Sequence, residues 1–275
     1  MRLTTRLEKP SDYYGTDANY EYMSTSQLKA FLGTPGITAC EERALAEVTG
    51  QYVRPDSKAL LLGSYIDVML TGTEDEQHEF RESHPEMISS RGTTKGQPKV
   101  EYRIADEMIT RAFADADNGG IFMRALTGER QKVVTGEIHG HKFKGRIDVL
   151  GDGFITDLKT VESVNRKYYN DGWWDFISWW GYDLQGAIYQ ELVYQTTGNR
   201  WPFYIAALSK QTPCDIDLLQ VPQERLDEAM ERLTPDALGR IAALKTGEEQ
   251  PERCERCDWC RMTKVIRKPR ILEVV

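Results

Sequence analysis

The distribution of apolar and polar residues predicts a mostly helical first half of the chain. The stretches with helical spacing are residues 24–33, 40–49, 57–70 and 100–117. A glycine stands at the end of the first stretch and just after the next two, at Gly33, Gly50 and Gly72, which is typical of helix C-termini. Residues 83–99 have no such period and are rich in glycine, serine and proline, so they predict a surface loop.

The middle of the chain changes to short runs typical of β-strands. The predicted strands are residues 130–138, 142–150, 154–161, 202–209 and 215–221, with helices at 182–196 and 222–245. His139-Gly140 and Asp152-Gly153 read as hairpin turns between the first three strands. Helices around a sheet that comes largely from the middle of the chain indicate one α/β domain.

The second predicted hairpin carries charged side chains in strands that otherwise read as buried. Counting outward from Asp152-Gly153 as a two-residue turn places Asp148 opposite Asp157, with Cβ atoms about 5 Å apart. Lys159 lies two residues beyond Asp157 and shares its face. Two carboxylates this close repel each other unless one is protonated or a cation bridges them. A hard divalent cation such as Mg²⁺ is therefore expected at this position.

Composition and charge exclude several classes of protein. The chain has 275 residues, of which 40% are hydrophobic and 28% charged, as in ordinary globular proteins. It has no run of about 20 apolar residues, and its N-terminal residues do not predict a signal peptide, so we expect a cytoplasmic protein with no membrane partner. The net charge of −8 argues against a general polyanion binder but is compatible with a local basic cleft.

Three of the five cysteines form a cluster near the C-terminus. Cys254, Cys257 and Cys260 are each separated by two residues, which in a reducing compartment is more typical of metal binding than of disulfides. Three thiolates need a fourth ligand. A tetrahedral zinc ion and an iron–sulfur cluster are both compatible with this spacing.

The hairpin sequence, G-R-I-D followed after a tight turn by I-T-D-L-K-T, resembles the nuclease core of the PD-(D/E)XK superfamily. The resemblance implies that Asp148 and Asp157 are ligands of Mg²⁺ or Mn²⁺, with the carbonyl of Leu158 as a third ligand. It also implies that Lys159 orients or activates the attacking water and stabilises charge on the phosphate. The same fold has a mixed central sheet flanked by helices.

Two further motifs resemble those of RecB-like nucleases. Gln185 and Tyr189 match Q-x-x-x-Y, a motif that orders the active site and contacts DNA. Gly63 matches the start of G-x-x-x-H, but Asp67 replaces the histidine that serves as a metal ligand. A carboxylate can replace imidazole as a ligand of Mg²⁺ or Mn²⁺, although a polar residue on a mixed helix is an equally simple interpretation.

Residues 24–35, S-T-S-Q-L-K-A-F-L-G-T-P, also resemble the opening of these enzymes, and the chain is similar to phage-type exonucleases of the RecE-like or RecB-like branch. The resemblance predicts a single nuclease domain over residues 1–275. Its parts are an N-terminal helical part at 24–127, a catalytic core at 128–221, and a C-terminal helix with the cysteine cluster at 222–275. Relatives of this kind join an upstream cysteine to three C-terminal ones around a [4Fe–4S] cluster, which implies Cys40 as the fourth ligand and leaves Cys214 free. Zinc stays an alternative because the spacing before Cys260 is shorter than usual.

The resemblance implies a metal-dependent DNA exonuclease in phage-type recombination or DNA repair, in the cytoplasm of a bacterial or phage-infected cell. Its partners would be double-stranded DNA ends or a single strand, a single-strand annealing protein, and in some cases further copies of the chain. We expect Lys144 and Arg146 to flank the scissile phosphate, because they share the strand face of Asp148, and Tyr168 and Trp173 to stack on bases of a single strand. The competing hypotheses are a sequence-specific endonuclease and a non-catalytic DNA-binding scaffold on the same fold.

Overall fold

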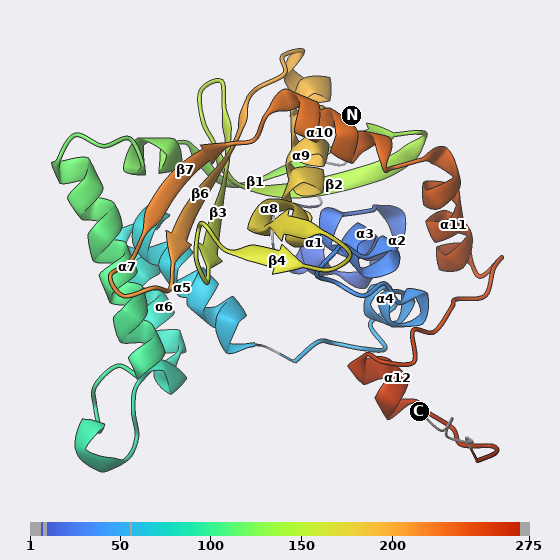
Figure 1. The fold of residues 1–275 in the computed structure, drawn as a ribbon, viewed down its shortest axis with the longest axis horizontal. Helices are drawn as coiled ribbons and strands as arrows, with labels where there is room; N and C mark the ends of the chain where they lie inside the picture. The colour runs from blue at the N-terminus through green and yellow to red at the C-terminus, as the bar shows by residue number, and fades with distance from the viewer. Residues whose placement is uncertain (1–6, 8–9, 56, 270–275) are drawn as a thin grey trace.

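A five-stranded mixed sheet forms the centre of the protein (Figure 1). The computed structural model describes residues 7, 10–55 and 57–269. The strands are β1 (Glu129–Ile138), β2 (His141–Leu150), β3 (Ile155–Val161), β6 (Phe203–Ser209) and β7 (Ile216–Gln220), in the spatial order β1-β2-β3-β6-β7. Strands β3 and β6 are parallel and the other neighbours are antiparallel. The predicted mixed α/β fold is confirmed.

Helices cover both faces of the sheet. On one face, α9 (Tyr182–Thr197) packs fully buried side chains such as Ile188 and Leu192 into a core shared with Ile147 and Phe203. Helices α3 (Thr25–Leu32), α10 (Gln223–Glu231) and α11 (Pro235–Thr246) add to this core. On the other face, α5 (Lys58–Thr71) and α7 (Val100–Asp117) bury Ile66 and Met108. The sheet is thus apolar on both sides, and charged side chains within it need a specific reason.

Local signals account for most of the helix ends. The side chains of Ser24 and Ser57 accept hydrogen bonds from backbone N–H groups in the first turns of α3 and α5, and Thr73 forms a capping box with Glu76 at the start of α6 (Glu74–Ser83). Helix α6 was not predicted from the sequence.

The remaining short elements are α1 (Pro10–Tyr14), α2 (Thr16–Glu21), α4 (Glu41–Val48), α8 (Phe176–Trp179), α12 (Asp258–Met262), the strands β4 (Lys167–Tyr169) and β5 (Trp173–Asp175), and the 3₁₀ turns η2 (Pro85–Met87), η3 (Gly92–Thr94) and η4 (Met123–Leu126).

The single helix predicted over residues 222–245 is wrong. The structure has two helices there, α10 and α11, and the break falls just before Pro235. Proline lacks an N–H group and fits the first position of a helix, and the side chain of Thr234 accepts a hydrogen bond from the N–H of Ala237. A new helix therefore begins at this point.

The register of the second hairpin is the one counted from the sequence. Val149 pairs with Thr156 and Leu150 with Ile155, and the N–H of Gly151 donates to the carbonyl of Phe154 across the Asp152-Gly153 turn. Asp148 and Asp157 are the next residues outward on the two strands.

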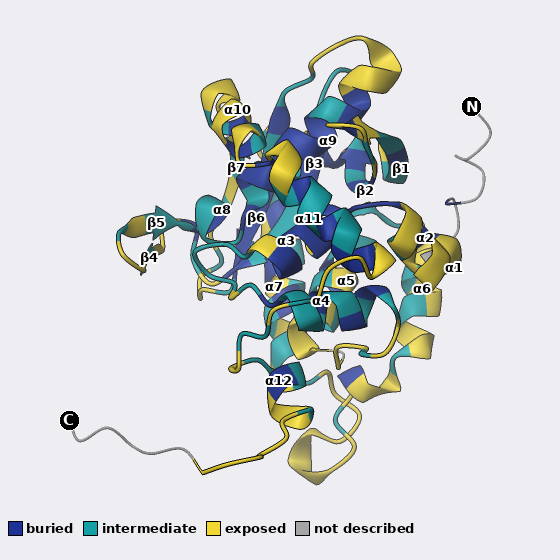
Figure 2. Cartoon of the chain, turned by 90° about the vertical axis from the view of Figure 1, so that its right-hand side faces the viewer, coloured by how far each residue is buried: buried dark blue, intermediate teal, exposed yellow. Residues whose placement is uncertain are grey.

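The N-terminal and C-terminal segments are held together by a buried lysine of α11. Lys245 is 5% exposed, and its Nζ donates to the carbonyls of Asn19 and Tyr22 and to Oε1 of Gln27, at 2.8, 2.9 and 2.9 Å. Figure 2 shows α11 lying over the helices of the N-terminal part. This lysine therefore joins residues at opposite ends of the sequence.

Replacing Lys245 by methionine is expected to lower the free energy of unfolding by about 3 kcal/mol, because three buried acceptors lose their donor while the aliphatic chain is retained. Urea denaturation followed by circular dichroism measures the change. The matched control is Lys95→Met on the exposed 83–99 segment, which we expect to have little effect. Equal stability of both variants would contradict a structural role for Lys245.

Nowhere in the described part of the chain does a helix combine the length and the apolar character that crossing a membrane requires.

Candidate active site

A cleft of about 770 Å³ opens beside the second hairpin. It lies where α5 approaches the ends of β1, β2 and β3. The charged and polar residues that line it include Asp67, Arg130, Gln131, Arg146, Asp148 and Lys159. The residues of the 83–99 segment do not line it, so the cleft is formed by the sheet, α5 and part of the N-terminal region.

Asp157 is the most deeply buried acid of the site, with 1% of its surface exposed. Its Oδ1 accepts a hydrogen bond of 2.7 Å from Nε2 of Gln185. Its Oδ2 pairs with the ammonium group of Lys159. Asp157 is therefore held on one oxygen by an amide and on the other by a cation, which favours its ionised form.

Gln185 and Tyr189 link α9 to both strands of the hairpin. Nε2 of Gln185 also lies 3.3 Å from the hydroxyl of Tyr189, and this hydroxyl donates to the carbonyl of Arg146 at 2.9 Å. The ring of Tyr189 lies so close to β2 that a Cβ atom at Gly145 would be 2.8 Å from it, which explains the glycine at this position. Oε1 of Gln185 faces Nζ of Lys29 of α3 at 3.3 Å. The Gln185 amide is therefore held from three sides.

Asp148 and its neighbours form a second part of the site. The N–H of Leu158 donates to Oδ2 of Asp148 at 3.0 Å. Burial and the nearby charge of Asp157 raise the pKa of Asp148 to about 7. These two effects favour the protonated form of Asp148, and a divalent cation would offset both the burial and the repulsion by Asp157.

Gln131 links Asp67 of α5 to Asp148. Nε2 of Gln131 donates to Oδ2 of Asp67 at 2.9 Å and lies 3.4 Å from Oδ1 of Asp148. Gln131 has a φ of 49°, and the regular pairing of β1 with β2 skips it, although it lies directly opposite Asp148. A left-handed conformation is costly for a residue with a side chain and is often found at functional sites. Burial raises the pKa of Asp67.

Two lysines approach the ring of Tyr182 at the first turn of α9. Nζ of Lys159 lies 4.9 Å from the ring centre and Nζ of Lys29 lies 4.8 Å from it. Burial lowers the pKa of Lys159, but Asp157 and Asp148 outweigh this effect, so the net direction is upward. For Lys29 the net direction is downward, because burial and the charge of Lys159 lower its pKa to about 7. Lys159 is therefore the permanently charged member of the pair.

The donor set fits a hard divalent cation. Asp67 and Asp148 line the cleft, the buried carboxylate of Asp157 pairs with the cleft-lining Lys159, and the carbonyl of Leu158 follows directly on Asp157. Oxygen ligands of this kind suit Mg²⁺ or Mn²⁺. The raised pKa values of Asp67 and Asp148 indicate two carboxylates whose burial is not fully offset by the positive charges around them.

The four predicted DNA contacts differ in their positions. Arg146 lines the cleft beside Tyr14. Trp173 is 74% exposed on the β4–β5 hairpin, which projects from the body in Figure 2. Tyr168 is half-buried and stacks on Trp179, with ring centres 4.8 Å apart.

The predicted DNA contact of Lys144 is wrong. Its side chain is only 1% exposed, and its Nζ donates to the carbonyl of Tyr13 at 2.5 Å and to Oδ1 of Asn19 at 2.8 Å. The N-terminal segment covers this part of β2, because the backbone of Met23 bonds to Lys142 and Lys144. The alternation of residues along β2 could not show that a segment far away in the sequence covers Lys144.

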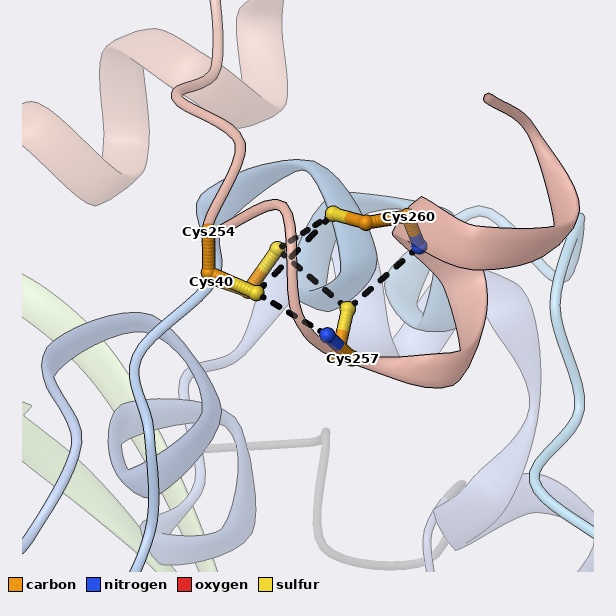
Figure 3. Close-up of side chains that lie close together, drawn as sticks. All are labelled: Cys40, Cys254, Cys257 and Cys260. Carbon is orange, nitrogen blue, oxygen red and sulfur yellow. Dashed lines mark hydrogen bonds between the residues drawn. The ribbon is translucent and has the colours of Figure 1, made fainter. Parts of the chain in front are cut away.

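Four cysteines lie together at a second site (Figure 3). The Sγ atoms of Cys40, Cys254, Cys257 and Cys260 all lie within 4.8 Å of one another. Cys40 precedes α4, and the other three lie in and before α12, so the group joins the two ends of the chain. Cys214 lies elsewhere, with its Sγ 3.5 Å from the carbonyl of Asp215.

Lys29, Gln131 and Tyr182 are site residues that were not predicted from the sequence. A usable signal existed for Gln131, because counting outward from the His139-Gly140 turn places it opposite Asp148. Lys29 and Tyr182 had no comparable signal, since their proximity depends on how α3 packs against α9.

A mixed sheet with this hairpin, and with Asp157 in contact with both Lys159 and Gln185, defines a protein of the PD-(D/E)XK nuclease class. Residues 24–263 match the family described as a PDDEXK-like domain of unknown function, and the chain belongs to that family. The crystal structure of a protein from Eubacterium rectale, named a "putative exonuclease", is similar with a TM-score of 0.86 and 38% sequence identity over 96% of both chains. No curated protein matches the chain.

Proposed function

We propose that this protein is a metal-dependent deoxyribonuclease that hydrolyses phosphodiester bonds from the ends of DNA, within a single nuclease domain. The observation that carries the proposal is a cleft lined by Asp67, Asp148 and the charged amine of Lys159, with the buried carboxylate of Asp157 paired to that amine. Membership of the PDDEXK-like family supports the nuclease class. The name of the Eubacterium rectale relative supports an exonuclease.

In the proposed site, Asp67, Asp148, Asp157 and the carbonyl of Leu158 hold Mg²⁺ or Mn²⁺. Such a cation, when bound, lowers the pKa of a water molecule and stabilises charge on phosphate oxygens. The chain's own contribution is to fix these ligands. Gln185 holds Asp157, and the N–H of Leu158 holds Asp148.

Lys159 acts in this proposal as a donor of hydrogen bonds. Its raised pKa keeps the amine protonated at neutral pH, so it does not accept a proton in this state. An ammonium group beside the scissile phosphate can orient the attacking water and stabilise the charge that develops on the phosphate oxygens. The ring of Tyr182 and the carboxylate of Asp157 hold the amine in place.

The DNA strand would lie along the cleft, with Arg146 and Arg130 as phosphate contacts from its lining. Trp173 is placed for stacking on an unpaired base. Because the chain has a net charge of −8, attraction to DNA depends on this local group of cations and should weaken as salt rises. Digestion from ends leaves single strands, which fits a role with an annealing protein in phage-type recombination or in DNA repair.

The test uses two substrates of identical sequence, one linear and one covalently closed, with Mg²⁺ or Mn²⁺. We expect progressive loss of the linear DNA from its ends and an intact circle. Discrete fragments from the circle would favour the alternative, a sequence-specific endonuclease. If neither substrate is cut with either metal, the protein is a DNA-binding scaffold on the same fold.

A further inference from the structure

The four cysteine sulfur atoms have the spacing of ligands to a single ion. Sγ of Cys40 lies 3.6 Å from that of Cys260 and 3.7 Å from that of Cys257, and the sulfur atoms of Cys254 and Cys260 are 3.9 Å apart. No pair within the group exceeds 4.8 Å. Figure 3 shows the four side chains pointing toward one common centre.

These distances distinguish between the two kinds of metal centre that are compatible with the sequence, a zinc ion and a [4Fe–4S] cluster. A zinc–sulfur bond of about 2.3 Å places the corners of a tetrahedron about 3.8 Å apart. A cubane cluster binds each thiolate to a different iron atom, so its four sulfur ligands spread around the whole cluster, about 6 Å apart. The sulfur–sulfur distances of 3.6, 3.7 and 3.9 Å agree with the first value, and the upper limit of 4.8 Å for the group is shorter than the second.

The surroundings of the sulfur atoms also suit a structural ion. The N–H of Cys257 donates to Sγ of Cys254 at 3.3 Å, and the N–H of Cys260 donates to Sγ of Cys257 at 3.5 Å. Hydrogen bonds of this kind stabilise thiolates. Cys40 and Cys260 are 2% and 1% exposed, so the centre is closed on the protein side.

Four protein ligands leave no open position for water or substrate, which is typical of a structural rather than a catalytic zinc site. We propose that Cys40, Cys254, Cys257 and Cys260 bind one structural Zn²⁺, and that the chain does not carry the [4Fe–4S] cluster implied by its resemblance to cluster-bearing nucleases. The ion fixes α12 to the start of α4. The N–H of Cys40 donates to the carbonyl of Ala30, so the ion also supports α3.

The test measures metal content and needs no DNA, so its outcome is independent of the proposed nuclease activity. The full chain is produced in iron-supplemented cells and purified without oxygen, which gives a cluster every chance to form. We expect a colourless protein with about one zinc per chain and almost no iron. A brown protein with about four irons per chain would overturn the proposal, as would a metal-free folded protein with all its thiols reactive.

Variants then locate the ion. Cys254→Ser should lose zinc and melt at a lower temperature, whereas Cys254→His should keep about one zinc, because histidine is an alternative zinc ligand. Cys214→Ser is the matched control and should keep both zinc and stability. Full zinc content in Cys254→Ser would place the metal elsewhere and contradict the assignment. Cobalt in place of zinc should give the visible absorption of a tetrahedral thiolate site.

Discussion

Replacing Asp157 by asparagine is expected to reduce DNA cleavage by at least about 10³-fold while the fold is retained. The amide keeps the shape of the side chain and can still accept the hydrogen bond of Gln185 through its oxygen. It removes the negative charge that the proposed metal and Lys159 both require. Lys159→Met should have a similar effect, because it removes the ammonium group that pairs with Oδ2 of Asp157.

The measurement is the initial rate on linear DNA with saturating Mg²⁺, together with circular dichroism to verify folding. Asp152→Asn is the matched control, since it changes an exposed aspartate in the turn of the same hairpin. We expect this control to cleave at the normal rate. Near-normal cleavage by Asp157→Asn would show that the chemistry takes place elsewhere.

Replacing Asp67 by alanine is expected to lower cleavage by about 10²-fold at low metal concentration, with partial recovery when Mn²⁺ is raised. Asp67 enters the site from α5 and is joined to Asp148 through Gln131, so its loss weakens a metal ligand set without removing the core hairpin. Asp67→His should retain much more activity, because imidazole can also bind Mn²⁺.

The rate as a function of Mn²⁺ concentration distinguishes a ligand from a structural residue. A lost ligand changes the metal concentration needed for half-maximal rate, whereas a destabilised helix changes the melting temperature. Asp75→Ala on the exposed part of α6 is the control and should change neither. If Asp67→Ala needs no more metal than the unaltered protein, Asp67 is only a polar residue of α5.

The sequence was sufficient where local rules decide the structure. The Asp-Gly turn set the register that brings Asp148 beside Asp157, and the spacing of Gln185 and Tyr189 placed both on one side of α9. Glycines and serines marked most helix ends. These features depend on neighbours within a few residues, so a single sequence contains them.

The sequence was insufficient where distant segments meet. The burial of Lys144 depends on residues 13–23, which lie more than 100 positions earlier, and nothing in β2 itself reveals that cover. The approach of Lys29 to Gln185 is of the same kind. Thr234 and Pro235 carried a readable signal for a new helix, and the prediction of one long helix failed because it gave more weight to the apolar period than to the proline.

The joining of the two ends of the chain has a consequence for how the protein is made. Cys40 and Cys260 are 220 residues apart, and Lys245 reaches back to Asn19 and Gln27. Helix α3, which carries Lys29 to Gln185, contains Gln27 and is followed by Cys40, so both attachments act on it. A chain still on the ribosome lacks the C-terminal partners of this helix, and contacts of such long sequence separation form late in folding. The contacts that hold α3 beside the cleft are therefore complete only after residues 245–260 have been synthesised and folded back onto it.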